Sequence, residues 1–224
     1  HLKWAGQYAV KHKPDVIIHI GDHYDFPSLS SYDKGTKSFE GRRYLADVQA
    51  GNNSLDVFMA PIHAEQARQR ANKKAIWKPR MVFCIGNHEN RITRAVEHFK
   101  AHGWEGIPFL QVEVIDGVAY SHYFTSGVMG RPVASARALV TKKMMSCVMG
   151  HVQDRDIAYA RRGDGKGVTG LFAGIFYVED QGYLTPQTNS SWRGIWMLHE
   201  VEDGGFDELP ISINYLAKKY GGIE

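Results

Sequence analysis

Three short polar strings, each placed directly after an apolar run, constrain the fold of this chain most. They are Gly-Asp-His-Tyr-Asp at 21–25, Gly-Asn-His-Glu at 86–89 and Gly-His at 150–151. The apolar runs before them, at 16–20, 81–85 and 147–149, predict buried strands. In an open α/β sheet, the loops at the carboxyl ends of the strands converge on one crevice where ligands bind. Oxygen and nitrogen donors gathered there are what a pair of catalytic divalent metal ions needs.

The order of the remaining elements indicates an α/β protein. The first half of the sequence alternates between helix and strand patterns, and the second half is mainly strand, which predicts a four-layer α/β/β/α sandwich of two mixed sheets flanked by helices. The helices are expected at 2–12, 54–77, 89–102 and 132–142. The strands are expected at 15–20, 80–85, 109–114, 118–124, 146–149, 156–161, 168–177, 193–201 and 209–213. The pair Asp116-Gly117 predicts a tight turn between two of these strands.

A chain of 224 residues suits one domain with a full core. We therefore expect a single domain over 1–224, in which 33–78 forms a largely helical insert. A doubly wound fold should open with a strand, whereas this sequence enters a helical pattern directly after His1. We expect a further strand to precede that residue.

Composition narrows the classes of function and partner. Hydrophobic residues make up 43% and charged residues 23%, as in globular proteins, and no apolar run approaches the ~18 residues of a membrane span. The net charge of +3 is too small to indicate a nucleic-acid partner by itself, although it leaves room for a local basic patch. Cys84 and Cys147 both fall in predicted buried strands and indicate reduced thiols, so we expect a cytoplasmic protein.

Taken together, the strings at 21–25 and 86–89, the later His122 and the Gly150-His151 pair resemble the calcineurin-like metallophosphoesterase superfamily over about residues 1–213, and most of all its phage and bacterial members. The resemblance implies a hydrolase that carries two divalent metal ions, with manganese expected and iron, zinc or nickel as alternatives. It implies that the metal ligands are Asp22, as the bridging carboxylate, with Asn87, His122 and His151. Gln153 is a further candidate, through its amide oxygen.

The same resemblance implies the reaction and the residues that carry it out. A metal-bridging hydroxide would attack a phosphate mono- or diester in line, and His88 would protonate the leaving oxygen or stabilise the phosphoryl group. Asp25 would orient the His88 imidazole. Arg91 is expected to bind a substrate phosphate oxygen, or instead to pair with Glu89 or Glu97 on its own helix.

Two features depart from the family pattern. The family opens with Asp-x-His, which holds the second metal ion, and no Asp-x-His occurs in this sequence. The family's Gly-His-x-His string reads Gly-His-Val-Gln at 150–153. In addition, Phe26 stands where the protein phosphatases of the family carry arginine, so specificity for phosphoproteins does not carry over.

Simpler roles exist for the same residues when each is taken alone. Asp22 and Asn87 are also common turn residues, and His122 also fits a half-buried strand histidine. Three hypotheses for the whole chain follow. The first is a phosphoesterase, the second is a DNA or RNA nuclease of the same superfamily, and the third is a non-catalytic scaffold with a degenerate metal site.

Overall fold

The structure is a computed structural model, and it describes residues 1–30, 40–91, 96–127, 129–178, 180 and 191–221. The chain forms two compact units. Unit 1 comprises His1–Gly106 and Leu216–Glu224, and unit 2 comprises Ile107–Tyr215. That the whole of 1–224 acts as a single domain stays a prediction. None of the described helices combines the length and the apolar character that crossing a bilayer requires.

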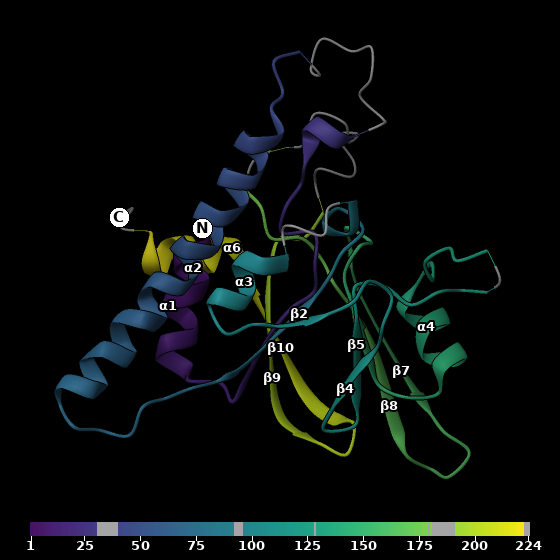
Figure 1. Cartoon of the computed structure of the whole chain (residues 1–224). Helices are drawn as coiled ribbons and strands as arrows, with labels where there is room; N and C mark the ends of the chain where they lie inside the picture. The colour runs from purple at the N-terminus through teal and green to yellow at the C-terminus, as the bar shows by residue number, and fades with distance from the viewer. Residues whose placement is uncertain (31–39, 92–95, 128, 179, 181–190, 222–224) are drawn as a thin grey trace. The chain divides into compact units, whose positions relative to one another are not determined.

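Unit 1 is built on a three-stranded sheet in the order β1-β2-β3, formed by β1 (Val16–His19), β2 (Arg80–Cys84) and β3 (Glu105–Ile107). β1 and β2 pair in parallel, with Val16 opposite Arg80 and His19 opposite Phe83. The helices of this unit are α1 (Leu2–His12), α2 (Tyr44–Ala71), α3 (Val96–Ala101) and the short η1 (Pro27–Leu29) and η3 (Glu89–Arg91). α1 packs against α2, as Figure 1 shows.

The core of unit 1 lies between α2 and β2. It is made of the buried side chains Leu55, Met59, Ile62, Met81, Phe83, Phe99 and Trp104. The rings of Phe83 and Phe99 stack with their centroids 4.6 Å apart. Because α2 contributes buried residues at helical spacing, this apolar contact fixes the helix against the strand that leads to the Gly-Asn-His-Glu string.

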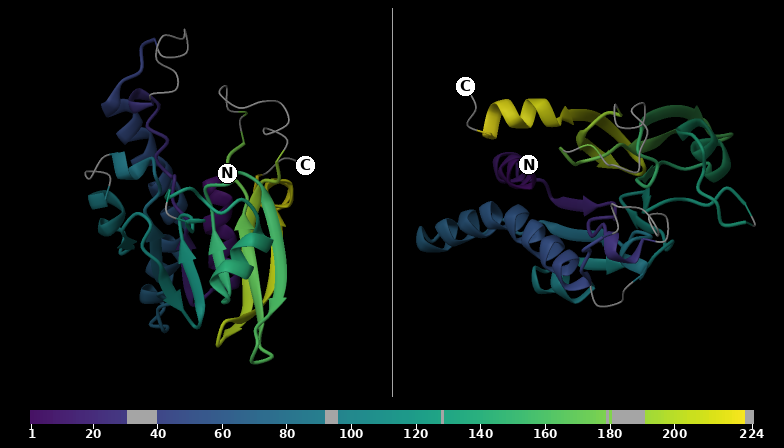
Figure 2. Two further views of the ribbon diagram at one scale, coloured as in Figure 1. Left: turned by 90° about the vertical axis from the view of Figure 1, so that its right-hand side faces the viewer. Right: turned by 90° about the horizontal axis from the view of Figure 1, so that it is seen from above.

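Unit 2 contains a five-stranded mixed sheet in the order β4-β5-β6-β8-β7. Its strands are β4 (Glu113–Ile115), β5 (Val118–Ser121), β6 (Cys147–Met149), β7 (Arg155–Arg161) and β8 (Gly167–Ala173). β5, β6 and β8 run parallel to one another, and α4 (Ala136–Lys143) packs on β7 and β8. A long hairpin of β9 (Gly194–Glu202) and β10 (Gly205–Ser212) follows, and Figure 2 shows it in two orientations. The last helix, α6 (Ile213–Tyr220), begins in unit 2 and ends in unit 1.

The predicted α/β class is confirmed, and the sheets are consistent with an α/β sandwich. Several of the predicted helix and strand boundaries were wrong. The helix expected at 54–77 runs over Tyr44–Ala71, because Gly51 lets α2 lie directly against the Tyr24 ring. The strand expected at 209–213 begins at Gly205, and the strand expected at 109–114 covers only Glu113–Ile115. β3 and α6 were not expected. Residues 92–95 of the helix expected at 89–102, and 33–39 of the insert, lie outside the described residues.

Two Asp-Gly turns in unit 2 lie tip to tip. Asp116 and Gly117 have φ of 48° and 81° and join β4 to β5, as the sequence predicts. Asp203 and Gly204 repeat this conformation, with φ of 48° and 81°, between β9 and β10. Both pairs fit a type I′ hairpin turn, which needs positive φ at its two central positions. The N–H of Gly204 donates to the carbonyl oxygen of Asp116 over 2.7 Å, so the two turns hold the hairpin to the sheet.

A substitution tests this contact. A Cβ atom at Gly117 would lie 2.4 Å from the backbone nitrogen of Gly204, whereas one at Gly165, a turn glycine with similar φ, would meet nothing within 4 Å. Both substitutions to alanine carry the strain of positive φ, about 1–2 kcal/mol. Gly117→Ala should lower the free energy of unfolding in urea by about 2–4 kcal/mol, clearly more than Gly165→Ala. Equal losses for the two variants would show that the turns do not support each other.

Candidate metal centre

In unit 1, two polar strings follow the carboxyl ends of neighbouring parallel strands. β1 ends at His19 and leads into 21–25, and β2 ends at Cys84 and leads into 86–89. Since His19 and Phe83 are register partners, the two loops leave the sheet side by side. The expected convergence of these strings at one sheet edge is therefore present within this unit.

Glu89 ties the two loops together. Its side chain is completely buried and accepts three backbone hydrogen bonds, from Asp22 (2.9 Å), Tyr24 (2.9 Å) and Gly86 (2.8 Å). Burial and the nearby charge of Asp22 raise the pKa of the Glu89 carboxyl, while the backbone donors act in the opposite direction. All three partners are donors, which suits a carboxylate. The sequence pattern alone does not predict this role of Glu89, although a side chain three residues after Gly86 can reach back to the backbone of its own loop.

The carboxylate of Asp22 is held by the second loop as well. Its Oδ1 accepts the backbone N–H of His88 over 3.1 Å, and its backbone lies in the left-handed region with φ of 53°. A Cβ atom at Gly86 would lie 2.2 Å from Asp22 Oδ1 and 2.6 Å from Glu89 Oε2. Glycine is therefore required at position 86 for the two carboxylates to lie where they do. Non-glycine residues with this backbone conformation cluster at functional sites.

His88 and Asp25 face each other. His88 Nδ1 lies 3.1 Å from Asp25 Oδ1, and both side chains are partly open to solvent, at 21% and 52% exposure. A carboxylate at this distance from Nδ1 could orient the imidazole ring, with Nε2 as the second ring nitrogen. The pair predicted from the resemblance is thus in contact, while its catalytic role stays a prediction.

His23 and Tyr24, inside the first string, attach this loop to α2. His23 Nε2 lies 3.0 Å from the carbonyl oxygen of Gly51 and 2.8 Å from Ser54 Oγ. The buried Tyr24 hydroxyl donates to Asn52 Oδ1 over 3.0 Å, and burial raises the pKa of this phenol above its ordinary value. These contacts attach the first loop to α2.

Unit 2 brings two histidines together at the ends of another parallel strand pair. His122 follows β5, and His151 follows β6, where it adopts a left-handed backbone with φ of 61°. The Gly150 N–H donates to the His122 carbonyl oxygen over 3.0 Å, which fixes the two strand ends to each other. His122 is 1% exposed, and its Nε2 lies 3.2 Å from His151 Nδ1. The Tyr123 ring packs on His151 with centroids 4.7 Å apart.

The separation of these two ring nitrogens suits a shared metal ion. Nitrogen ligands bind zinc at about 2.0–2.1 Å, so two of them at angles of 90–110° lie about 3.0–3.4 Å apart. Within unit 2, His122 and His151 could therefore hold a metal ion together with a carboxylate, and Asp22 is the carboxylate that the sequence predicts for this role.

The other predicted site residues are placed as follows. Asn87 lies in the second loop and is half-buried, and Gln153 lies two residues after His151 and is also half-buried. Each offers an amide oxygen, and their assignment as ligands stays a prediction. Arg91 ends η3, and its side chain lies outside what the structure describes, so its predicted contact with a phosphate also stays a prediction.

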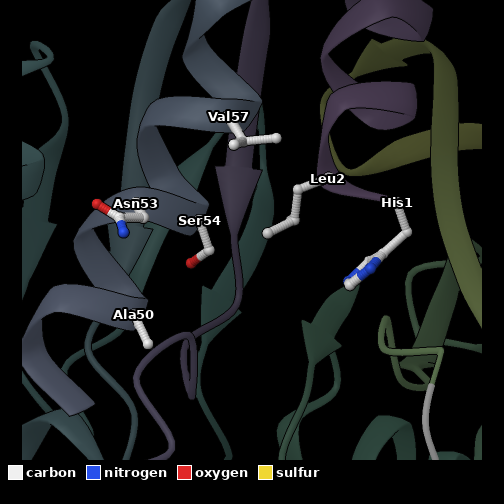
Figure 3. Close-up of a pocket in the computed structure, with 6 residues that line it drawn as sticks. All are labelled: His1, Leu2, Ala50, Asn53, Ser54 and Val57. Atoms are coloured by element: carbon white, nitrogen blue, oxygen red, sulfur yellow. The ribbon is translucent and has the colours of Figure 1, made fainter. Parts of the chain in front are cut away.

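A separate pocket of about 330 Å³ lies in unit 1 between the start of α1 and the middle of α2 (Figure 3). Its lining residues are His1, Leu2, Ala50, Asn53, Ser54 and Val57. None of them is a predicted ligand or catalytic residue, although Ser54 contacts His23 of the first polar string.

Comparison with known proteins adds nothing to this picture. No protein-family model matches the chain, and no curated protein matches it either.

The role of Glu89 can be measured. In Glu89→Gln one carboxylate oxygen becomes an NH₂ group that faces a backbone donor, so at least one buried N–H loses its acceptor. We expect the free energy of unfolding to fall by about 1–3 kcal/mol, measured by urea unfolding. Glu105→Gln is the control, because Glu105 makes an exposed ion pair with Arg80 worth about 0–1 kcal/mol. A loss no larger than that of the control would mean that Glu89 does not hold the loops.

Proposed function

We propose that this chain is a metal-dependent hydrolase of phosphate mono- or diesters, similar to the calcineurin-like metallophosphoesterases. The observation that carries the proposal is the pair of facing ring nitrogens of His122 and His151, 3.2 Å apart at the ends of neighbouring parallel strands. The second support is the contact of His88 with Asp25 at the corresponding strand ends of unit 1.

The donor set would hold one divalent metal ion, and a second ion would share the Asp22 carboxylate. Asp22 would supply a carboxylate able to bridge them, His122 and His151 would supply nitrogens, and Asn87 and Gln153 would supply amide oxygens. Mixed oxygen and nitrogen donors suit manganese first, and also iron, zinc or nickel, rather than calcium. When bound, the ions would neutralise charge on the phosphate and lower the pKa of a water molecule.

The remaining predicted residues would act on the leaving group and on the phosphate itself. His88 is half-buried and faces Asp25 with Nδ1, so Nε2 would deliver a proton to the departing oxygen. Arg91, directly after the second string, would bind a phosphate oxygen. The attacking water needs no serine or cysteine nucleophile, which agrees with the burial of both thiols.

Turnover of small phosphate esters tests this assignment. We expect the protein with Mn²⁺ to hydrolyse para-nitrophenyl phosphate or its bis ester. His88→Ala should lower kcat by about 100-fold to 10,000-fold through loss of the proton donor. Asp22→Asn should remove activity through loss of the bridging charge. Asp164→Asn, which changes a carboxylate in a turn of unit 2, is the control and should leave kcat unchanged. Activity that survives both His88→Ala and Asp22→Asn would exclude the proposed chemistry.

Metal affinity tests the histidine pair independently of turnover. Loss of groups that merely support a ligand costs about 10–100-fold in affinity, so His122→Ala or His151→Ala should weaken Mn²⁺ or Zn²⁺ binding by about 100-fold or more. Isothermal titration calorimetry gives the affinity, and elemental analysis gives the number of ions per chain. His199→Ala, at an exposed histidine of β9, is the matched control. Fewer than about one ion per chain, together with no turnover, would favour a non-catalytic scaffold.

A further inference from the structure

We propose that unit 1 binds the phosphate backbone of nucleic acid through a basic loop. This basic loop is defined as residues 70–78, which end α2 and lead to β2 (Figure 1). It carries four exposed cations and no carboxylate, and the cations are Arg70, Lys73, Lys74 and Lys78.

The small net charge of the chain conceals an uneven distribution. Unit 1 holds 18 Lys+Arg and 12 Asp+Glu, whereas unit 2 holds 9 Lys+Arg and 12 Asp+Glu. All of the excess positive charge therefore belongs to unit 1. A concentrated basic surface, rather than the total charge, is what attracts a polyanion.

The cations of the basic loop are available for a partner. Two neighbouring carboxylates are already engaged by other residues: Glu65 pairs with Arg68 and Lys13, and Glu105 pairs with Arg80. Among the described residues, no carboxylate forms an ion pair with any of the four loop cations. The dipole of α2 accounts for Arg70 in the last helical turn, but the three lysines lie beyond the end of the helix.

The loop is also held in one conformation. The buried Gln69 accepts the Trp77 N–H at its side-chain oxygen (2.8 Å) and the Lys74 N–H at its carbonyl oxygen (2.9 Å). Gln66 Nε2 donates to the Trp77 carbonyl oxygen over 3.1 Å, and Trp77 Nε1 donates to Pro14 over 3.0 Å. Because the backbone that carries the lysines is already ordered, binding costs less conformational entropy than it would for a free loop.

The neighbouring apolar groups favour nucleic acid over a membrane. Ile76 and Trp77 are the large apolar residues of the basic loop, and both are half-buried. Trp77 packs against the core of unit 1, and its indole nitrogen is bonded to Pro14. The loop therefore presents charge with no exposed large apolar side chain to enter a lipid layer, and its lysines suit sequence-independent contacts with phosphates.

This surface is separate from the proposed metal centre. The basic loop precedes the start of β2 at Arg80, whereas the polar strings follow the far ends of β1 and β2. Five residues of strand span about 15 Å at 3.3 Å per residue. The basic loop would thus hold nucleic acid at the amino ends of the two strands, and the inference does not rest on the proposed hydrolase activity.

Fluorescence anisotropy with a labelled 20-base-pair DNA, in EDTA and at several salt concentrations, tests the proposal without any contribution from the metal centre. The unmodified protein should bind at 50 mM salt and weaken steeply as salt rises. Lys73→Gln/Lys74→Gln should weaken binding by at least about tenfold. It should also reduce the slope of log K against log salt by about 0.9 for each phosphate that the variant no longer neutralises.

The matched control is Lys142→Gln/Lys143→Gln, which removes a lysine pair at the end of α4 in unit 2. We expect this control to change neither the affinity nor the salt slope. Three results would overturn the proposal: no DNA binding by the unmodified protein at 50 mM salt, equal losses for the two double variants, or equally tight lysine-dependent binding to phosphatidylserine vesicles at the same ionic strength.

Discussion

The arrangement of unit 1 depends on the buried carboxylate of Glu89. It accepts backbone N–H groups from both loops that follow β1 and β2. Neither loop can therefore move without breaking a hydrogen bond to this buried carboxylate. The arrangement also places the Asp22 carboxylate close to that of Glu89, and the charge of Asp22 raises the pKa of Glu89. Backbone donors offset part of that repulsion. A cation beside Asp22 would offset more, which is why a fold that holds two carboxylates this close is suited to a metal ligand at Asp22.

Both units contain the same local arrangement of strand ends. A parallel pair, β1 and β2 or β5 and β6, ends in two short turns that are hydrogen-bonded to each other, and polar side chains project from those turns. Asp22 and His151 both take left-handed backbone conformations, which cost about 1–3 kcal/mol each and persist only where the surroundings enforce them.

The sequence predicts the strand ends well because apolar runs followed by Gly-Asp, Gly-Asn or Gly-His have few other structural solutions. It predicts the Asp116-Gly117 turn for the same reason, since positive φ at both positions admits few residue types. It does not predict the start of α2 at Tyr44, because the stretch around Gly51 has weak helix propensity, and its close packing on the Tyr24 ring is visible only in the fold. Nor does it predict the role of Glu89, since its partners are backbone groups that no side-chain pattern reveals.

Charge shows a further limit of whole-chain averages. A total of +3 combines a basic unit 1 with an acidic unit 2, and the division between them is visible only once the chain is folded. Within unit 1 the polar strings and the basic loop lie at opposite ends of β1 and β2, because one follows these strands and the other precedes β2. A phosphate-rich polymer held by the basic loop would therefore reach the proposed metal centre only along its own length. A small ester would need only the proposed metal centre. Hydrolysis of a nucleic acid would therefore depend on salt concentration and hydrolysis of a small ester would not, whereas both would depend on His88.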